Sequence, residues 1–518
     1  MRRLTNEIER EAAQREIASL LDARGEWFCA EGKRGAPMAL RPGEWELSAV
    51  GAGVHFTYLS ERGLRVWRVT AWEWTGERLL LEVVRRAGAE RATLELVPRA
   101  SARAGIEVLR AARQAACEQL AKLVCEFLPG AKIERVRLSA GARRTEPGRY
   151  ARILLRRGGR GGLTAVTGVI VDLKRQEADA VVSSALLWWS RLRESVRKET
   201  ISELHLIVTH ELRDPIMRRL ALLRADVRRE LRLWEANESW RELALVPLTD
   251  LRELLAASPR FQRPAQFLLS EAAARIIALA PKKIDVVRAR HGETLRYRGL
   301  PFARVRRVGD VERVWFGVAT AGEKTAARRL LDEESWPQLA KLLTELSAHR
   351  RADAPDLRHA FYRSMPESWL ESLLRRDITQ LDPGLVVAPL HAQFRAARDG
   401  QGTGSRPVDL LALRRDGRLV VIELKTSEDV ALALQAADYW RQLEAHRRAG
   451  HITQAKLFGE LPISDEPPLV YLVAPFLRFH RSFHALARLV SPEIEMYRFD
   501  LNEDWRAGVR VVRRTRVS

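Results

Sequence analysis

The chain contains stretches with two different spacings of its apolar residues. In residues 3–23 and 106–128 the apolar positions recur every three or four residues, which predicts two helices. In residues 45–98 apolar and polar positions alternate singly between short polar turns, the pattern of a small antiparallel β-module. A mixed α/β unit follows this module. Its predicted elements are strands at 132–138, 150–156 and 164–173, a helix at 180–198, a strand at 203–209 and further helix.

The second half of the chain repeats this order. Residues 262–280 predict a helix, and residues 283–319 predict a second set of short strands. Helices at 325–348 and 356–376 then lead to a second mixed α/β unit. Its predicted elements are strands at 385–395, 407–414 and 418–425, a helix at 428–448, a strand at 469–475, a helix at 478–490 and a strand at 493–501.

Short sequence echoes connect the two halves. The segment Val169–Lys174 (VIVDLK) resembles Val420–Lys425 (VVIELK), and a tryptophan follows each lysine by fifteen residues, at Trp189 and Trp440. Four echoes in the same order indicate a tandem duplication, and a repeat changes the interpretation of the whole fold. The other two echoes are Asn237–Trp240 with Asn502–Trp505, and Arg62–Leu64 with Arg298–Leu300.

These patterns predict a mixed α+β (α/β) protein in which a small β-rich module followed by an αβββαβ unit occurs twice. Three tryptophans of the first module, Trp67, Trp72 and Trp74, would form a platform for nucleic-acid bases if they shared one exposed face. The alternation instead favours their division between core and surface. The predicted domains are 1–100 (helix and β-module), 101–245 (α/β unit), 246–350 (second β-module with helices) and 351–518 (second α/β unit).

Composition narrows the class of protein. The chain has 518 residues, of which 46% are hydrophobic, so it can bury sizeable cores and is not globally disordered. The formal net charge of +21 favours a polyanionic partner, with nucleic acid as the first candidate. Only 11 of the 88 basic residues are lysine, so a GC-rich coding sequence is an alternative source of the excess arginine.

Two further features exclude other classes. The first residues lack the apolar core of a signal peptide, and no segment approaches the roughly 18 apolar residues of a membrane span, so we expect a soluble, cytoplasmic protein without a membrane partner. The three cysteines, Cys29, Cys117 and Cys125, are too few for a four-thiolate zinc or iron–sulfur site. The metal site that the sequence supports therefore uses carboxylates.

Residues 407–425 form the constellation with the clearest chemistry. Asp409 opens one predicted strand, and an Asp-Gly turn leads to the next strand, which ends in Glu423-Leu424-Lys425. Residues two apart in a strand share a face, so Glu423 and Lys425 lie side by side, and hairpin pairing brings Asp409 next to Glu423. Converging carboxylates among apolar strands need a counter-ion, which Mg²⁺ would supply. The alternative is an exposed ion pair of Glu423 and Lys425 on an edge strand, which would contribute little.

At these positions the sequence resembles the PD-(D/E)xK nuclease superfamily. Gln435 and Tyr439, on the helix that follows, resemble the Q-x-x-x-Y motif of its RecB-like branch, and Glu371 in Trp369–Leu373 resembles an acidic residue that the family carries on a helix before the sheet. The resemblance covers roughly residues 366–500 and implies a restriction-endonuclease-like domain.

The resemblance also implies a role for each residue. Asp409, Glu423 and Glu371 would hold Mg²⁺ (or Mn²⁺), which polarises the phosphodiester and lowers the pKa of a bound water. Lys425 would orient this water or stabilise charge on the phosphate. Gln435 and Tyr439 would position the metal ligands or the DNA backbone. The glycine-rich stretch 398–406 could contact phosphates or serve as a plain connector.

The first copy departs from this pattern. It keeps Asp172 and Lys174 and a helix carboxylate at Glu118, but Ala151 stands where Asp409 would have its counterpart and Ser184 falls at the spacing of Gln435. Since a lost carboxylate leaves little charge to hold Mg²⁺, we expect a degenerate, non-catalytic unit. The length of loop 158–162 leaves the alignment of Ala151, and hence a residual second site, open.

The leading hypothesis is a divalent-metal-dependent deoxyribonuclease in DNA repair, restriction or defence, acting on DNA. At the level of architecture it resembles nuclease subunits that work with a separate NTPase or helicase subunit, and a homodimer is compatible with the sequence. The alternative is a non-catalytic nucleic-acid-binding protein that uses nuclease folds as scaffolds. A third hypothesis is an RNase or a structure-specific resolvase.

Overall fold

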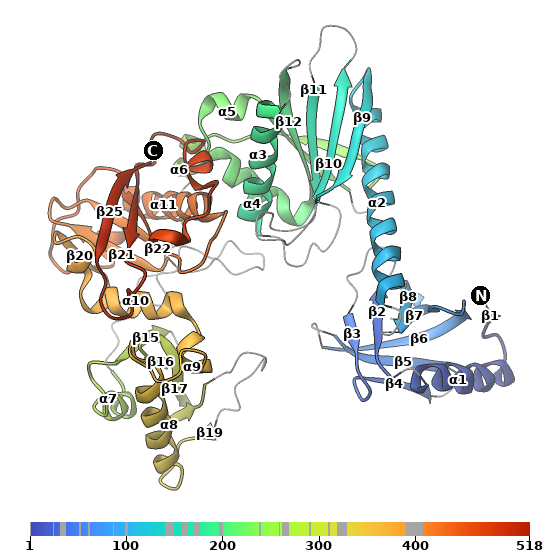
Figure 1. The fold of residues 1–518 in the computed structure, drawn as a ribbon, viewed down its shortest axis with the longest axis horizontal. Helices are drawn as coiled ribbons and strands as arrows, with labels where there is room; N and C mark the ends of the chain where they lie inside the picture. The colour runs from blue at the N-terminus through green and yellow to red at the C-terminus, as the bar shows by residue number, and fades with distance from the viewer. Residues whose placement is uncertain are drawn as a thin grey trace. The chain divides into compact units, whose positions relative to one another are not determined.

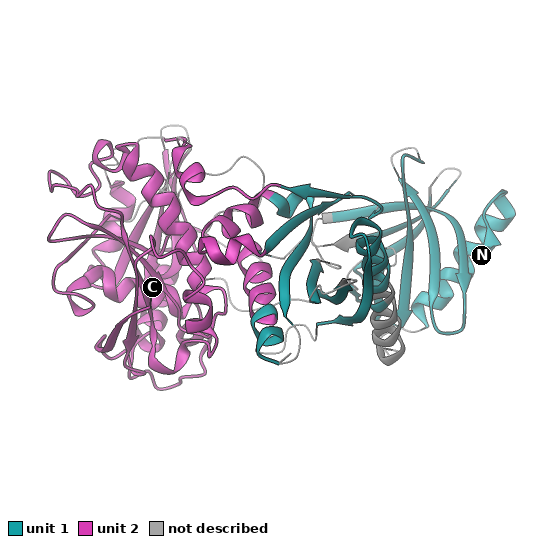
Figure 2. Ribbon diagram, turned by 90° about the horizontal axis from the view of Figure 1, so that it is seen from above, with its two compact units in different colours: residues 1–177, 189–213, 231–246 teal, residues 178–188, 214–230, 247–518 magenta. Residues whose placement is uncertain are grey.

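The computed structural model forms two compact units (Figures 1 and 2). Unit 1 comprises residues 1–177, 189–213 and 231–246, and unit 2 comprises residues 178–188, 214–230 and 247–518. No helix in the described part of the chain is long and apolar enough to cross a membrane. The described residues are 2–23, 25–31, 38–50, 53–60, 63–85, 88–98, 102–139, 150–157, 163–169, 177–195, 200–237, 240–257, 259–261, 269–289, 292–308, 311–318, 329–389 and 408–517.

An antiparallel sheet of eight strands opens unit 1, in the order β3-β2-β8-β7-β6-β5-β4 with β1 beside β6. Helix α1 packs on it through Ile17 and Leu21, and Asn6 caps this helix. Trp67 and Trp72 lie in the core and Trp74 packs against it, so the exposed aromatic platform does not form. The elements are β1 (Arg2–Arg3), α1 (Glu7–Asp22), β2 (Trp27–Glu31), β3 (Met38–Leu40), β4 (Trp45–Val50), β5 (Gly53–Ser60), β6 (Gly63–Trp74), β7 (Leu79–Arg85) and β8 (Glu90–Pro98).

The second sheet of unit 1 has six strands in chain order, β9 to β14. Cys117 of helix α2 is fully buried against this sheet with Leu120 and Val124, as expected of a free thiol that acts as a small apolar side chain. Helices α3 and α4 fall partly in each unit. The elements are α2 (Ala102–Phe127), β9 (Ala131–Leu138), β10 (Tyr150–Arg157), β11 (Leu163–Val169), α3 (Ala178–Ser195), β12 (Ile201–Thr209), α4 (His210–Ala221), α5 (Ala225–Arg229), β13 (Leu231–Ala236) and β14 (Leu243–Val246).

Unit 2 contains an antiparallel five-stranded sheet, β15 to β19, that packs against α7 and α8. The β16–β17 turn at Arg298-Gly299 approaches helix α10 so closely that a Cβ atom on Gly299 would lie 1.9 Å from the Ser368 carbonyl oxygen. This contact fixes the sheet beside the helix that leads to the last sheet. The elements are α6 (Leu251–Ala256), α7 (Glu271–Ile277), β15 (Ile284–Ala289), β16 (Gly292–Tyr297), β17 (Leu300–Val308), β18 (Val311–Phe316), β19 (Arg329–Leu330) and α8 (Trp336–His349).

The last sheet of unit 2 has six strands in chain order, β20 to β25. Strand β22 is buried along its whole length, between the core formed with α10 and the core formed with α11. The elements are α9 (Ala360–Arg363), α10 (Pro366–Arg376), η3 (Ile378–Gln380), β20 (Leu385–Val387), β21 (Leu410–Arg414), β22 (Leu419–Leu424), α11 (Leu432–Arg448), α12 (His451–Gln454), β23 (Leu469–Pro475), η4 (Phe476–Arg478), α13 (Phe483–Ala487), β24 (Met496–Leu501) and β25 (Val511–Arg516).

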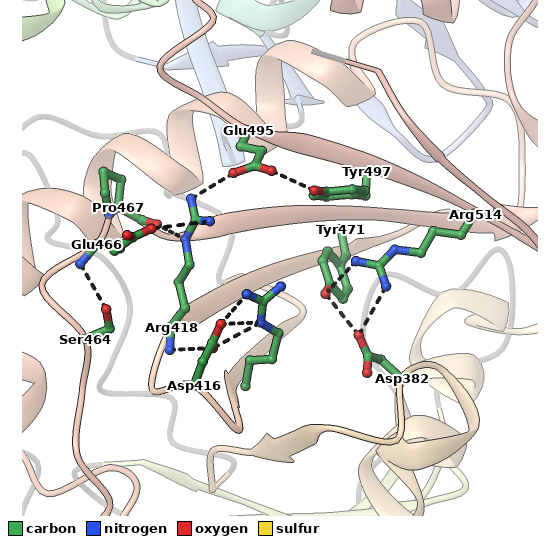
Figure 3. Close-up of polar contacts among 11 residues, drawn as sticks. Asp382, Asp416, Arg418, Ser464, Glu466, Pro467, Tyr471, Glu495, Tyr497 and Arg514 are labelled. Carbon is green, nitrogen blue, oxygen red and sulfur yellow. Dashed lines mark hydrogen bonds and ion pairs between the residues drawn. The ribbon is translucent and has the colours of Figure 1, made fainter.

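Ion pairs and hydrogen bonds hold the amino ends of β22 to β24 together (Figure 3). Arg418, just before β22, donates to the Pro467 carbonyl at 2.6 Å and pairs with Glu495 at 2.9 Å. Glu495 also accepts from the Tyr497 hydroxyl at 2.6 Å. The Asp416-Gly417 turn enters β22 as predicted, with Gly417 at φ 81°. These contacts all lie at the amino ends of the strands, whereas Glu423 lies near the carboxyl end of β22.

The mixed α+β class is confirmed. The two six-stranded sheets share one strand order and one pairing sequence: antiparallel, antiparallel, parallel, parallel, antiparallel. This is the topology that the duplication hypothesis requires, whereas the two β-modules differ in strand number. The duplication and the four-domain division stay predictions, although each predicted domain carries one sheet.

Several predicted elements differ from the observed ones. The helix expected at 356–376 is broken at Met365 (φ 45°), because the residue before Pro366 is disfavoured in the helical region. The helix expected at 478–490 shortens to α13, since His480 Nδ1 accepts from the Ser482 amide in a local turn. The helix expected at 325–348 begins only at Trp336, and β19 lies within its expected range. The strands that were not predicted are β1, β2, β3, β13, β14, β19 and β25.

Candidate active site

Strand pairing brings Asp409 beside Glu423. Asp409 directly precedes β21, whose Leu410 pairs with Ile422 of β22, so the next position outward on each strand is Asp409 and Glu423. Asp409 Oδ2 accepts a hydrogen bond from the Leu424 amide at 2.8 Å. This bond fixes the carboxylate at the carboxyl end of β22, where the hairpin argument from the sequence places it.

Glu423 and Lys425 form a buried ion pair. Lys425 Nζ lies 2.9 Å from Glu423 Oε1, and the two residues are only 5% and 1% exposed. An exposed pair on an edge strand is therefore not what the structure shows, because β22 lies between β21 and β23. Asp429 lies 3.7 Å from Lys425 Nζ and is a charged neighbour that the sequence reasoning did not include.

The two carboxylates disfavour each other's ionisation. Burial, opposed in part by the Leu424 amide and Lys425, raises the pKa of Asp409 to about 7. Burial and then the charge of Asp409 raise the pKa of Glu423 well above its usual range. Burial alone would lower the pKa of Lys425, but the Glu423 carboxylate raises it above its usual range, so the lysine stays protonated. The site therefore holds one fixed cation and two carboxyl groups that would gain from a second cation.

Gln435 and Tyr439 lie on α11 next to this cluster. Gln435 Nε2 donates to the Tyr439 hydroxyl at 3.1 Å, as expected for side chains four residues apart on a helix. Burial, followed by the charge of Glu423, raises the pKa of Tyr439 above its usual range, which places the phenol within electrostatic reach of the carboxylates. Tyr439 also packs in one core with Val421 of β22, so the Gln435–Tyr439 pair lies on the side of α11 that faces this strand.

Glu371, the predicted third carboxylate, is engaged by arginines. Arg296 of β16 donates to its Oε2 at 3.0 Å, and Arg375 donates to its Oε1 at 2.9 Å. Arg375 also donates to the Asp409 carbonyl oxygen at 3.1 Å. Glu371 is close enough to contribute to the raised pKa of Asp409. In this structure, however, its oxygens hold an arginine network that joins β16 and α10 to the start of β21.

Glu367, one turn earlier on α10, is the acidic residue that the sequence reasoning missed. Its Oε1 accepts from the Thr426 amide at 3.5 Å, directly after Lys425. Its charge contributes to the raised pKa values of Asp409, Glu423 and Lys425. The available signal was the four-residue spacing from Glu371, which puts both carboxylates on one helix face.

The residues present fit a magnesium ion held by two carboxylates. Within the described residues, no group of three or more His, Cys, Asp or Glu side chains is arranged to hold a metal. Mg²⁺ commonly uses one or two carboxylates and keeps water and phosphate oxygens as its other ligands. Among the residues that the structure describes, Glu423 Oε2 is buried and has no hydrogen-bond partner, which is the type of atom that a bound cation would satisfy. The glycine-rich stretch 398–406 lies outside the described residues.

The corresponding region of the first copy lies largely outside the described residues, including Asp172 and Lys174. If Val169 corresponds to Val420, their strand partners Tyr150 and Ala412 correspond as well. Ala151, which pairs with Gly168, then corresponds to Leu413 and not to Asp409. The counterpart falls three residues before Tyr150, also outside the described residues. The alignment of Ala151 with Asp409 is therefore wrong under this register.

The other two first-copy residues, Glu118 and Ser184, lie within the described residues. Glu118 is exposed on α2 and accepts from Gln114 Nε2 at 3.0 Å. Ser184 is a buried residue of α3, 4% exposed.

No protein-family model and no curated protein matches this chain. A solved structure named "Structure of EndoMS-dsDNA2 complex" shares 17% sequence identity with it, over 37% of this chain and 81% of that chain, with a TM-score of 0.14. Similarity at this level establishes neither a common fold nor a common activity.

Proposed function

We propose that this protein is a divalent-metal-dependent nuclease whose active site is formed by Asp409, Glu423 and Lys425. The observation that carries the proposal is the buried arrangement at the end of β22. Lys425 is bonded to one oxygen of Glu423, and the second oxygen, beside Asp409, has no partner within the described part of the chain. An apolar site would not keep two carboxylates without a function for them, because burial of unpaired charge is costly.

Asp409 and Glu423 would hold Mg²⁺ or Mn²⁺, and a third ligand from α10 would be Glu367 or Glu371. The bound metal would supply Lewis-acid polarisation of the phosphodiester and a more acidic water. Lys425, bonded to Glu423, would serve as a positive charge that stabilises developing negative charge or orients the water. Gln435 and Tyr439 would position the ligands or the nucleic-acid backbone.

DNA is the proposed substrate. The net charge of +21 favours a polyanion, and the family resemblance of the motif favours phosphodiester hydrolysis in DNA, in repair, restriction or defence. A separate NTPase or helicase subunit and a homodimer are the partners that this proposal allows.

The direct test incubates the full chain with linear, circular and single-stranded DNA in Mg²⁺, Mn²⁺ or EDTA. We expect metal-dependent cleavage that is lost in Glu423→Gln and Lys425→Ala and kept in Glu495→Gln, a matched variant of the partly buried acid at the opposite ends of the strands. A parallel assay on RNA separates the RNase hypothesis. Cleavage that survives both site variants would overturn the proposed site.

The excess of arginine also fits an alternative function, that of a non-catalytic protein that binds nucleic acid. In that case the wild type and both site variants would bind DNA equally and none would cut it. Salt-dependent binding alone does not distinguish the two functions, since any strongly basic protein shows it.

A further inference from the structure

Arg219 of α4 lies between two carboxylates that are distant from each other in sequence. Its Nε lies 2.5 Å from Asp179 Oδ1 on α3, and its Nη1 lies 2.9 Å from Asp438 Oδ2 on α11. The three side chains are 15%, 12% and 5% exposed, so this is a buried network of one guanidinium and two carboxylates. All three residues belong to unit 2.

Asp438 connects this network to the candidate active site. It stands between Gln435 and Tyr439 on α11, and its oxygens also accept from Arg441 at 2.9 Å and from Gln442 at 2.7 Å. Burial opposes its ionisation, but Arg219 and then Arg441 hold the pKa of Asp438 below its usual value. Helix α11, which carries Gln435 and Tyr439, is therefore held by an ion pair with Arg219 from the first half of the chain.

A second set of contacts joins the same two regions. The Arg224 amide donates to the Leu489 carbonyl at 2.9 Å, and the Ser491 amide donates to the Leu222 carbonyl at 2.8 Å. Leu223 and Val490 form the antiparallel bridge between these bonds. Residues 222–224 precede β13 and residues 489–491 precede β24, so the bridge joins equivalent places in the two six-stranded topologies.

We propose that Arg219 is a positioning residue for the candidate active site: it orients Asp438, and through it the Gln435–Tyr439 face of α11, beside Glu423. This inference rests on the proposed function. In this proposal α3 and α4 support the candidate active site without contributing a catalytic residue. A buried ion network suits this task, because it adds little stability over apolar packing but accepts only one geometry.

The test compares full-length Arg219→Met with wild type in two measurements. The first is steady-state DNA cleavage in Mg²⁺, where we expect kcat to fall about 10- to 100-fold with KM changed less than about threefold. The second is amide hydrogen exchange, where we expect faster exchange across residues 432–448. Since exchange needs no activity, an inactive wild type would count against the proposed function and leave this inference measurable.

Four further variants keep the test decisive. Arg224→Ala removes an exposed pair with Asp226, whose side chains are 50% and 63% exposed, and should change neither measurement. The triple variant Asp179→Asn, Arg219→Met, Asp438→Asn removes all three charges and should recover melting temperature without recovering kcat. If Arg219→Met does not fold, Arg219→Lys and Asp438→Asn replace it. A variant with a lowered melting temperature but unchanged kcat and unchanged exchange in α11 would overturn the proposal.

Discussion

Asp409 is the residue in which burial and charge conflict most clearly. Its carboxylate lies beside Glu423 and within reach of the charges of Glu371 and Glu367, and only the Leu424 amide and Lys425 favour its ionised form. Such a residue binds a proton or a metal ion more readily than a solvated aspartate does. This competition gives a prediction that does not depend on catalysis.

We expect Asp409 to make stability fall as pH rises in EDTA. Because burial raises its pKa from 3.8 to about 7, the folded state binds a proton that the unfolded state releases, and the resulting stability is present below pH 4 and lost as pH rises through 7. Asp409→Asn should therefore gain stability over wild type between pH 5 and pH 8, by at most about 4 kcal/mol. Urea unfolding of wild type and Asp409→Asn at pH 5 and pH 8 measures this difference. An unfolding free energy that changes equally with pH in both proteins would contradict the prediction. With Mg²⁺, cleavage should rise through the same pH range, since the metal needs the ionised carboxylates.

The individual residues also differ in how far the sequence could predict their contacts. Asp409, Glu423 and Lys425 were predictable because a short hairpin fixes which side chains meet. The pairing of Arg219 with Asp438 was not, because 219 residues separate them and a single charged residue on a helix carries no information about a distant partner. Glu367 was missed for a milder reason: α10 offers two acids on one face, and only the contacts of each distinguish them.

At the scale of elements, helix α10 is where the second β-module meets the candidate active site. Arg296 of β16 reaches Glu371, and Arg375 continues the network to the Asp409 carbonyl. Glu367, one turn earlier on the same face of α10, accepts instead from the Thr426 amide. The two acids should therefore respond differently to the same substitution.

We expect Glu367→Gln to raise the Mg²⁺ concentration for half-maximal cleavage about tenfold or more with little loss of stability, since it removes charge from the site. Glu371→Gln should instead destabilise the fold by about 2–4 kcal/mol, because Arg296 and Arg375 would lose their carboxylate in a buried position. Magnesium titrations and urea unfolding of both variants measure the contrast. The reverse pattern would identify Glu371 as the metal ligand that the sequence predicted.

The turn at Gly299 provides a separate test of how α10 is placed. A methyl group there would lie 1.9 Å from the Ser368 carbonyl at φ 81°, so Gly299→Ala must move the turn away from α10. We expect a loss of about 2–4 kcal/mol in unfolding free energy. Gly450 is the matched control, because it has φ 71° and, among the described residues beyond its chain neighbours, a methyl group added to it would meet no atom within 4 Å. Gly450→Ala should lose only about 1 kcal/mol. Equal losses would show that the Gly299 contact does not restrain the turn.

For the whole molecule, apolar periodicity predicted the α+β class and most of the central strands, because a buried strand such as β22 is apolar at every position except Glu423. It did not predict β25, an edge strand whose Val511–Arg516 sequence is largely exposed and rich in arginine. Edge strands take their conformation from backbone pairing with a neighbour, which leaves little apolar pattern to detect. The common topology of the two six-stranded sheets becomes visible only when the order of all their strands is compared.

The proposed Asp409–Glu423–Lys425 site, which within the described residues lies in the last sheet, leads to a prediction about the product. One site of this kind hydrolyses one strand at each binding event, whereas a break in both strands needs two sites or two events. We therefore expect supercoiled plasmid to become nicked circles first and linear DNA only later, at a rate that depends on the concentration of nicked circles. Gel time courses at several protein concentrations measure this. Linear DNA formed without a nicked intermediate, at a rate that rises with the square of protein concentration, would indicate a homodimer that supplies the second site. The same product at a rate linear in protein concentration would instead assign activity to the first copy, and Asp172→Asn would then restore the nicked intermediate.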